Sequence, residues 1–116
     1  MGFSSEKLIL GVQTSSPAPS PGRQNAIFGY GRTSSNVSMT NLVNSSGVVA
    51  TDTTGVGTAR SYLAAAGYGT DKAIFGYGVA ASYASMTNLV NSSGVVASDT
   101  TGVGTARRLL ACASYG

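Results

Sequence analysis

The chain has no histidine, no tryptophan and a single cysteine, Cys112, among its 116 residues. Without histidine there is no Ser-His-Asp triad, no imidazole base and no typical zinc site. A single thiol cannot close a disulfide within the chain, and we expect Cys112 to be a small buried side chain, with a reactive thiol as the alternative. These absences exclude the common catalytic constellations, so we expect a protein that is not an enzyme and has no cofactor or metal.

Charged residues are also scarce, at 9% of the chain against about a quarter in an average globular protein. The seven basic residues outnumber the four acidic ones, but they are scattered, and no stripe of basic and aromatic residues is present. We therefore expect no nucleic-acid partner. The uninterrupted apolar runs are only a few residues long, so the sequence predicts no transmembrane span and no membrane partner.

What the chain does have is a repeat of 47 residues. The letters SMTNLVNSSGVVA occupy 38–50 and return at 85–97. Between the longer segments 26–60 and 73–107, 29 of 35 aligned positions are identical. A period of this length is typical of propellers and solenoids.

Turn-forming residues divide each unit into short runs. From Arg60 onward the turn segments are GYGTDK, FGYG with the variable loop after it, NSSG and DTTGVG. The intervening runs are SYLAAA, KAIF, SMTNLV and GVVA. The alanine-rich run favours a helix by composition, but it meets a glycine turn too soon to form a stable one. We therefore predict an all-β fold with four short strands in each unit.

These boundaries divide the chain into three parts. The segment 1–25 is predicted to hold one strand, KLILGV, followed by a linker that contains all three prolines. The first repeat is placed at 26–69 and the second at 70–116. KLILGV is expected to pair as the missing inner strand of the first repeat, which leaves RLLACASYG to complete a neighbour. Alternatively, KLILGV is expected to follow Gly116 of another copy.

The order of elements in the unit resembles the kelch repeat. An arginine, a strand of small residues, a turn and a strand ending in closely spaced glycines are here AR-SYLAAAGYGTDKAIFGYG, at 59–78. The segment SMTNLVNSSGVVASDTTGVGTAR resembles the two outer strands of that repeat. The wording DKAIFGYG, TNLV and GVVATDTTGVGTAR is also similar to tandem arrays in predicted virion structural proteins of marine phages. The likeness covers about 26–116, but the kelch double glycine is split by Tyr77 and the outer-strand tryptophan is missing.

The resemblance implies two four-stranded, kelch-like propeller blades. Because propellers have four to eight blades, two blades imply a piece of a longer array, an open stack or a ring of several copies. A trimer would supply six blades, so the expected partner is the chain itself, together with other virion proteins or a glycan. The implied function is a structural or receptor-binding component of a virus particle, located in the virion. The alternatives are a lectin-like, carbohydrate-binding propeller and a self-assembling fibre subunit.

Two charged positions recur in the repeat. Asp52 precedes Arg60 by eight residues, and Asp99 precedes Arg107 by the same spacing. We interpret them as a structural pair or a turn bond in each blade, in preference to an acid–base role, because catalysis rarely needs duplicate copies.

The hexapeptide RTSSNV at 32–37 is the variable part of the repeat, aligned with VAASYA at 79–84. Propeller loops gather on one face and commonly bind ligands. Arg32, Asn36 and Tyr83 are therefore candidates for contact with sugars or a protein surface. The alternative interpretation is that this loop binds nothing and only tolerates sequence drift.

Overall fold

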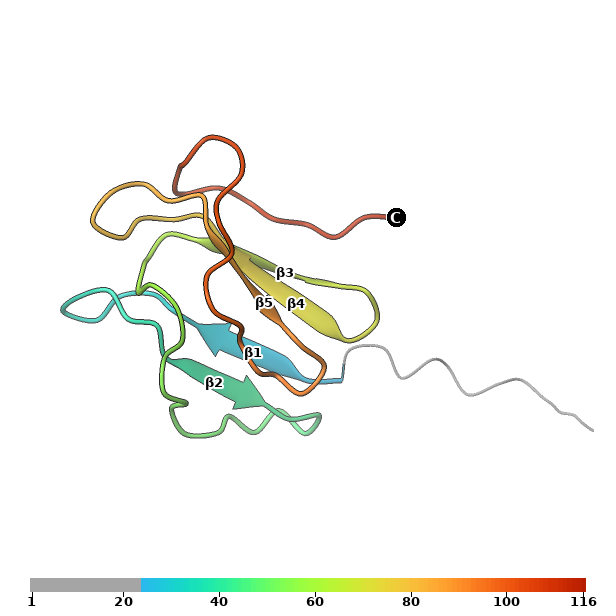
Figure 1. Ribbon diagram of the computed structural model, residues 1–116. Helices are drawn as coiled ribbons and strands as arrows, with labels where there is room; N and C mark the ends of the chain where they lie inside the picture. The colour runs from blue at the N-terminus through green and yellow to red at the C-terminus, as the bar shows by residue number, and fades with distance from the viewer. Residues whose placement is uncertain (1–23) are drawn as a thin grey trace, which may run out of the picture.

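The computed structural model describes residues 24–116, so the strand KLILGV and the prolines of the linker lie outside the described residues. Within 24–116 the chain forms strands, turns and loops and no helix (Figure 1), which confirms the all-β prediction. This part of the chain thus offers no helix long and apolar enough to cross a membrane. The strands are β1 (Ala26–Gly29), β2 (Thr40–Val43), β3 (Ala64–Tyr68), β4 (Lys72–Gly76) and β5 (Thr87–Val90).

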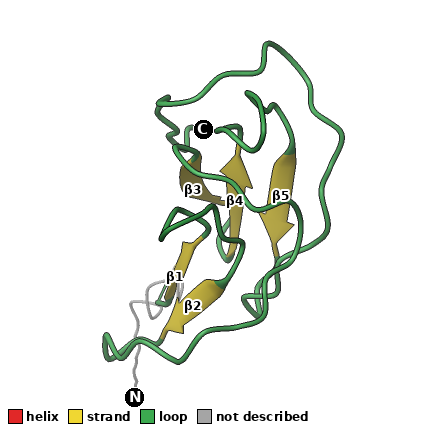
Figure 2. Ribbon diagram, turned by 90° about the vertical axis from the view of Figure 1, so that its left-hand side faces the viewer, coloured by secondary structure: helices red, strands yellow, loops and turns green. Residues whose placement is uncertain are grey.

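The strands form two small antiparallel sheets, one for each copy of the repeat (Figure 2). In the first sheet β1 pairs with β2, and in the second β4 lies between β3 and β5. The aligned strands keep the same register, because Ala26 faces Val43 as Ala73 faces Val90. The sequence repeat is therefore a structural repeat.

The strand β3 belongs to the second sheet, although it precedes residue 70. Its residues pair with β4 from Ala64 opposite Gly76 to Tyr68 opposite Lys72. The boundary between sheets thus falls before the boundary predicted between the repeats, and agrees with a unit counted from Arg60. Pairing with β4 also explains why this alanine-rich run is a strand and not a helix.

The run GVVA was predicted as a fourth strand, but it makes only isolated bridges. In the second repeat Val96 bridges Val90 and Thr100 bridges Thr87. Four steps along this run therefore face three steps along β5, as they do when one strand of a pair carries a bulge. The first repeat has the same offset. This extra residue interrupts the ladder between Val96 and Thr100, the stretch that contains Asp99.

The asparagine of NSSG closes the turn that precedes this run. The side-chain oxygen of Asn91 accepts hydrogen bonds from the backbone N–H groups of Ser93 and Val95, at 2.9 and 3.0 Å. Asn44 makes the same two bonds in the first repeat. The predicted role of NSSG as a turn is confirmed, and its mechanism is an asparagine side chain that replaces a backbone acceptor.

The apolar core lies between the two sheets. Tyr30, at the end of the first β-hairpin strand, packs against Phe75 of β4 with ring centroids 5.2 Å apart. Val90 and Val96 of the second sheet complete the buried cluster. The core therefore joins the repeats, and neither sheet has a separate one within the described residues.

Identical residues in the two repeats are buried to different extents. Phe75 is 4% exposed, whereas the aligned Phe28 is 63% exposed. Val96 is 8% exposed, whereas Val49 is 52% exposed. The first repeat covers these side chains of the second sheet, and within 24–116 no third sheet covers the first one. Cys112 was expected to be buried, but it is exposed, because its segment forms no strand and joins neither sheet.

Candidate functional site

The joint between the repeats is organised around Arg60, which is 0% exposed. Its Nε donates to the carbonyl of Tyr77 at 2.8 Å, and its Nη1 donates to the carbonyl of Thr58 at 2.9 Å. Its Nη2 donates to Oδ1 of Asn88, a side chain that is also 0% exposed. All three guanidinium nitrogens are bonded, as a buried arginine requires.

A carboxylate and an aromatic ring complete the surroundings of this charge. The Cζ atom of Arg60 lies 4.8 Å from the ring centre of Tyr30, within the range of a cation–π contact. Nη1 of Arg60 lies 4.0 Å from Oδ1 of Asp99. The Tyr30 hydroxyl donates to the carbonyl of Val56 at 2.8 Å, which fixes the ring in place. The buried charge is therefore compensated on several sides.

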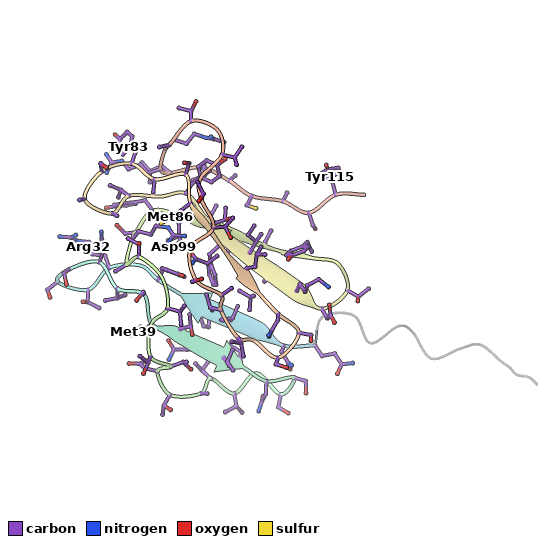
Figure 3. The ribbon with its side chains drawn as sticks, in the orientation of Figure 1. Arg32, Met39, Tyr83, Met86, Asp99 and Tyr115 are labelled. Carbon is purple, nitrogen blue, oxygen red and sulfur yellow. The ribbon has the colours of Figure 1, made fainter. Side chains whose placement is uncertain are left out.

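Asp99, which is labelled in Figure 3, is held by donors from both repeats. It accepts from the hydroxyl of Thr58 at 2.6 Å and from the backbone N–H of Thr58 at 3.1 Å. It also accepts from Nδ2 of Asn88 at 2.9 Å. Since Thr58 precedes Arg60 in the first repeat, one short segment supplies both the donors to Asp99 and the guanidinium beside it.

The observed pairing differs from the predicted pairing of Asp52 with Arg60 and of Asp99 with Arg107. The carboxylate next to Arg60 comes from the other repeat, because the chain after Asp52 crosses to the second sheet before it reaches Arg60. The described partner of Asp52 is Nδ2 of Asn41, at 2.8 Å. Arg60 and Asp99 thus link the two repeats, whereas Asp52 bonds within its own repeat.

Asn41 and Asn88 are functional residues that the sequence interpretation did not single out. Nδ2 of Asn88 donates to the carbonyl of Ala97 at 3.2 Å as well as to Asp99, and Asn41 makes the matching pair of bonds. An available signal was the asparagine inside the strand TNLV, a residue that is depleted in strands and here recurs in both copies.

These contacts set the protonation of two groups in the joint. The hydrogen bond from the Thr58 side chain lowers the pKa of Asp99 below its ordinary value, although partial burial acts in the opposite direction. The Asn88 side chain and the charge of Arg60 lower this pKa further. Burial raises the pKa of the Tyr30 hydroxyl above its ordinary value, and Arg60 opposes that rise.

The lowered pKa of Asp99 predicts a loss of stability in acid. Asp99 contributes stability that is fully present above the unfolded carboxyl pKa of about 4 and is lost as the pH falls through its lower folded pKa. We expect the melting temperature of the wild type to fall more steeply below pH 4 than that of D99N. Equal slopes for the wild type and D99N would contradict the role given to Asp99.

The two variable loops lie side by side at one end of the sheets (Figure 1). Each is a short hairpin, bridged between Arg32 and Asn36 and between Val79 and Tyr83. Nδ2 of Asn36 donates to the carbonyl of Val79 at 3.1 Å, which ties the first loop to the second. Nη1 of Arg32 lies 3.4 Å from Oδ1 of Asn36. The structure therefore brings Arg32 and Asn36 together, and Asn36 has an internal partner.

Tyr83 belongs to a small aromatic cluster at the second loop. Its ring is 56% exposed, and the Cζ atom of Arg108 lies 5.5 Å from the ring centre. The same guanidinium lies 5.4 Å from the ring of Tyr62, which is 51% exposed. Tyr62 and Arg108 were not singled out from the sequence, because they lie outside the variable segment. This surface offers stacking and hydrogen bonding, and no pair of acid–base groups.

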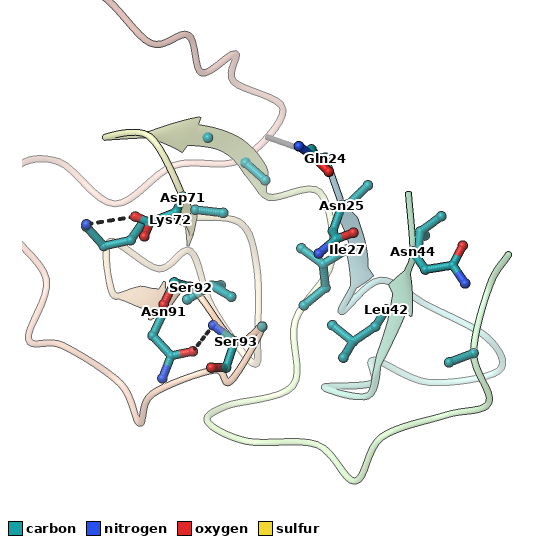
Figure 4. Close-up of a pocket in the computed structure, with 18 of the residues that line it drawn as sticks. Gln24, Asn25, Ile27, Leu42, Asn44, Asp71, Lys72, Asn91, Ser92 and Ser93 are labelled. Atoms are coloured by element: carbon teal, nitrogen blue, oxygen red, sulfur yellow. Dashed lines mark hydrogen bonds and ion pairs between the residues drawn. The ribbon is translucent and has the colours of Figure 1, made fainter. Parts of the chain in front are cut away.

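An open groove lies between the sheets at the opposite end from the loops (Figure 4). Its volume is about 880 Å³, and its floor includes Ile27, Leu42 and Phe75. At the rim, Nζ of Lys72 lies 3.1 Å from Oδ1 of Asp71. No cluster of three or more potential metal ligands is present in the groove or elsewhere within 24–116.

Comparison of the chain with protein-family models and with curated proteins gave no match.

Proposed function

We propose that this chain is a non-enzymatic structural or receptor-binding module of a virus particle, assembled through contacts between its repeats. The observation that supports assembly is the joint at Arg60. A fully buried charge with three hydrogen-bonded nitrogens is placed between the repeats, and its partners Asn88 and Asp99 come from the second repeat. A joint of this kind fixes how one repeat sits on the next, as repeat proteins require.

The finer proposal is that each unit is a kelch-like propeller blade. In support, β3, β4 and β5 follow one another across the second sheet, and the run that contains Val96 and Thr100 bridges the free edge of β5. The chain leaves the equivalent run of the first repeat and enters β3, which is the connection that successive blades use. Ring closure then requires further copies, and three copies supply six blades.

The receptor-binding part of the proposal concerns the variable loops. Arg32 and Tyr83 lie on neighbouring loops whose sequences differ while the supporting sheets stay nearly constant. A rigid scaffold that carries exposed, variable loops is the usual arrangement for recognition. The location in a virion rests on the resemblance to phage structural arrays.

A search for the chain in purified particles tests this function. Virus particles from the biological source of the sequence are separated on a density gradient, and the fractions are analysed by mass spectrometry. We expect peptides of this chain to peak with the particle band. Peptides confined to the soluble fractions, away from the major capsid protein, would contradict the virion proposal. A soluble host enzyme measured in the same fractions is the control for carry-over.

Carbohydrate binding is a second candidate, favoured by the two half-exposed rings of Tyr62 and Tyr83 around Arg108. Aromatic rings of this kind stack on the apolar faces of sugars. Binding of the isolated chain to a glycan array, lost when Tyr83 becomes alanine, would favour this candidate over the first.

A further inference from the structure

Each repeat has two different faces, and the internal joint uses one face from each. The second repeat contributes the face that carries Asn88 and Asp99, and the first contributes the face that carries Tyr30 and Arg60. The other face of each repeat is not used in the internal joint, and these two faces lie at opposite ends of the two-repeat unit. The head face is the aligned surface of the first repeat, formed by Phe28, Asn41, Val49 and Asp52. The tail face is the aligned surface of the second repeat, formed by Tyr77, Leu89, Gly104 and Arg107.

We infer that the tail face of one copy binds the head face of a second copy, with Arg107 placed against Asn41 and Asp52 of that copy. This inference deepens the proposed function and rests on its claim that the repeats assemble. The occupant is a second copy of this chain because the internal joint already shows the two faces bound to each other.

The arginine of the tail face already has the conformation that the joint requires. Nη1 of Arg107 donates to the carbonyl of Thr105 at 3.0 Å, as Arg60 donates to Thr58 at 2.9 Å. The Cζ atom of Arg107 lies 4.6 Å from the ring centre of Tyr77, against 4.8 Å between Arg60 and Tyr30. Arg107 nevertheless remains exposed. A preorganised side chain loses less conformational entropy when it binds.

The acceptor on the head face is formed as well. Nδ2 of Asn41 lies 3.2 Å from the carbonyl of Ala50 and 2.8 Å from Oδ1 of Asp52. In the internal joint the matching distances for Asn88 are 3.2 Å and 2.9 Å. These bonds orient the amide of Asn41 as the amide of Asn88 is oriented. Oδ1 of Asn41 is thus placed to accept from an arginine, as Oδ1 of Asn88 accepts from Arg60. The two faces also have opposite charge, which favours head-to-tail contact.

Apolar groups on the two faces complement each other in the same way. Phe28 and Val49 are 63% and 52% exposed, and their aligned residues are buried in the joint. On the tail face Leu89 is 42% exposed. Its counterpart Leu42 packs against Gly94 in the internal joint, where a Cβ added to Gly94 would lie 2.7 Å from Cδ2 of Leu42. At Gly47, the residue aligned with Gly94, nothing lies within 4 Å of an added Cβ. The head face therefore has open space where a leucine side chain is received in the joint.

The C-terminal segment gives an independent reason for a second copy. Residues 64–68 form β3 because β4 lies beside them, but the aligned residues 111–115 form no strand. In the head-to-tail arrangement they lie beside β1 of the next copy, which pairs with β2 alone among the described strands. An unpaired strand edge of this kind readily accepts another chain.

The repeat places no arginine at the aligned position within the chain, because the residue 47 positions before Arg60 is Gln13, which carries no charge. Arg107 of another copy offers Asn41 and Asp52 the guanidinium that Arg60 offers Asn88 and Asp99.

Two variants test this joint through their mixture. R107A removes the tail-face arginine and D52A removes the head-face carboxylate, so each variant keeps one intact face. By sedimentation velocity, we expect the wild-type chain to grow beyond 11.6 kDa as its concentration rises. Each variant alone should associate about 100-fold more weakly, because the remaining charge is left unpaired. Mixed together they should form a one-to-one dimer through the single joint that remains intact. G104A adds a steric test, since a Cβ at the aligned Gly57 would meet Asn88 and Asp99.

Four results would overturn the inference. The wild type would stay at 11.6 kDa at every concentration, or the mixed variants would fail to dimerise. Alternatively, both variants would associate as the wild type does. Finally, D52A would lower the melting temperature of a monomeric chain as D99A does, which would assign the head face to the chain's own N-terminal segment. None of these results depends on finding the chain in virus particles. If the joint is confirmed and the chain is absent from particles, only the virion proposal is rejected.

Discussion

Replacement of Arg60 with alanine is expected to destabilise the fold by about 3–5 kcal/mol, the usual consequence of removing one partner of a buried charged network. The substitution leaves the carbonyls of Tyr77 and Thr58 and the Oδ1 of Asn88 without their donor. It also opens a cavity beside Tyr30. Because a small domain is stable by about 5–15 kcal/mol, the loss is a large part of the total. Urea denaturation of wild type and R60A at concentrations where both are monomeric measures it.

R107A is the matched control, because the two arginines make the same bond to the residue two positions before them. Arg107 is exposed, so its removal should change the free energy of unfolding by no more than about 0.5 kcal/mol. R60K provides a second comparison, since a lysine has one nitrogen and cannot reach three separate acceptors. Similar values for R60A and R107A would show that the joint does not hold the two repeats together.

A methyl group at Gly57 is expected to have the second large effect. A Cβ there would lie 2.5 Å from Oδ1 of Asp99 and 2.6 Å from Nδ2 of Asn88, closer than real side chains approach. Gly57 also has φ +81, where an alanine is strained by about 1–2 kcal/mol. Overpacking of this kind costs about 1–3 kcal/mol more. We therefore expect G57A to unfold about 2–5 kcal/mol more easily than the wild type.

The repeat supplies the control for this substitution. Gly104 has φ +84, and a Cβ there would meet only the hydroxyl of Tyr77, at 3.3 Å. G104A should therefore show the backbone cost without the clash, and the difference between the two variants isolates the joint. Denaturant unfolding of both at monomeric concentrations measures it, since association with other copies would raise the apparent stability of either. If G104A is as destabilised as G57A, the clash with Asn88 and Asp99 is absent.

A buried arginine in an otherwise apolar joint is suited to specificity. Apolar sheets pack on one another in several registers with similar energies, but a guanidinium must meet both the Asn88 oxygen and the Asp99 carboxylate. Any other register leaves a charge buried and unpaired, which is costly. The polar network thus selects one placement of a repeat on its neighbour.

The turns and the sheet strands are where sequence and structure agree best. The predicted strand KAIF coincides with β4 except for its last residue, Gly76, and SMTNLV contains β5, because both runs are bounded by turn residues. The prediction that GVVA is a strand was wrong, because a run of small and β-branched residues does not reveal the extra residue that interrupts its pairing with β5. The partner of Arg60 was also hidden, because two carboxylates at equivalent positions of a repeat have the same local spacing.

The sequence by itself determined the 47-residue unit, the strands β4 and β5, the NSSG turns and the absence of a histidine-based site, because these depend on residue type and local order. Only the tertiary structure decided which of two identical residues is buried: Phe75 is covered and Phe28 is not, Arg60 is enclosed and Arg107 is exposed. It also decided that 64–68 is a strand while 111–115 is not. The physical reason is that burial and strand pairing depend on neighbours in space. The first repeat covers the second, and within 24–116 nothing covers the first in the same way, so identical residues have different neighbours.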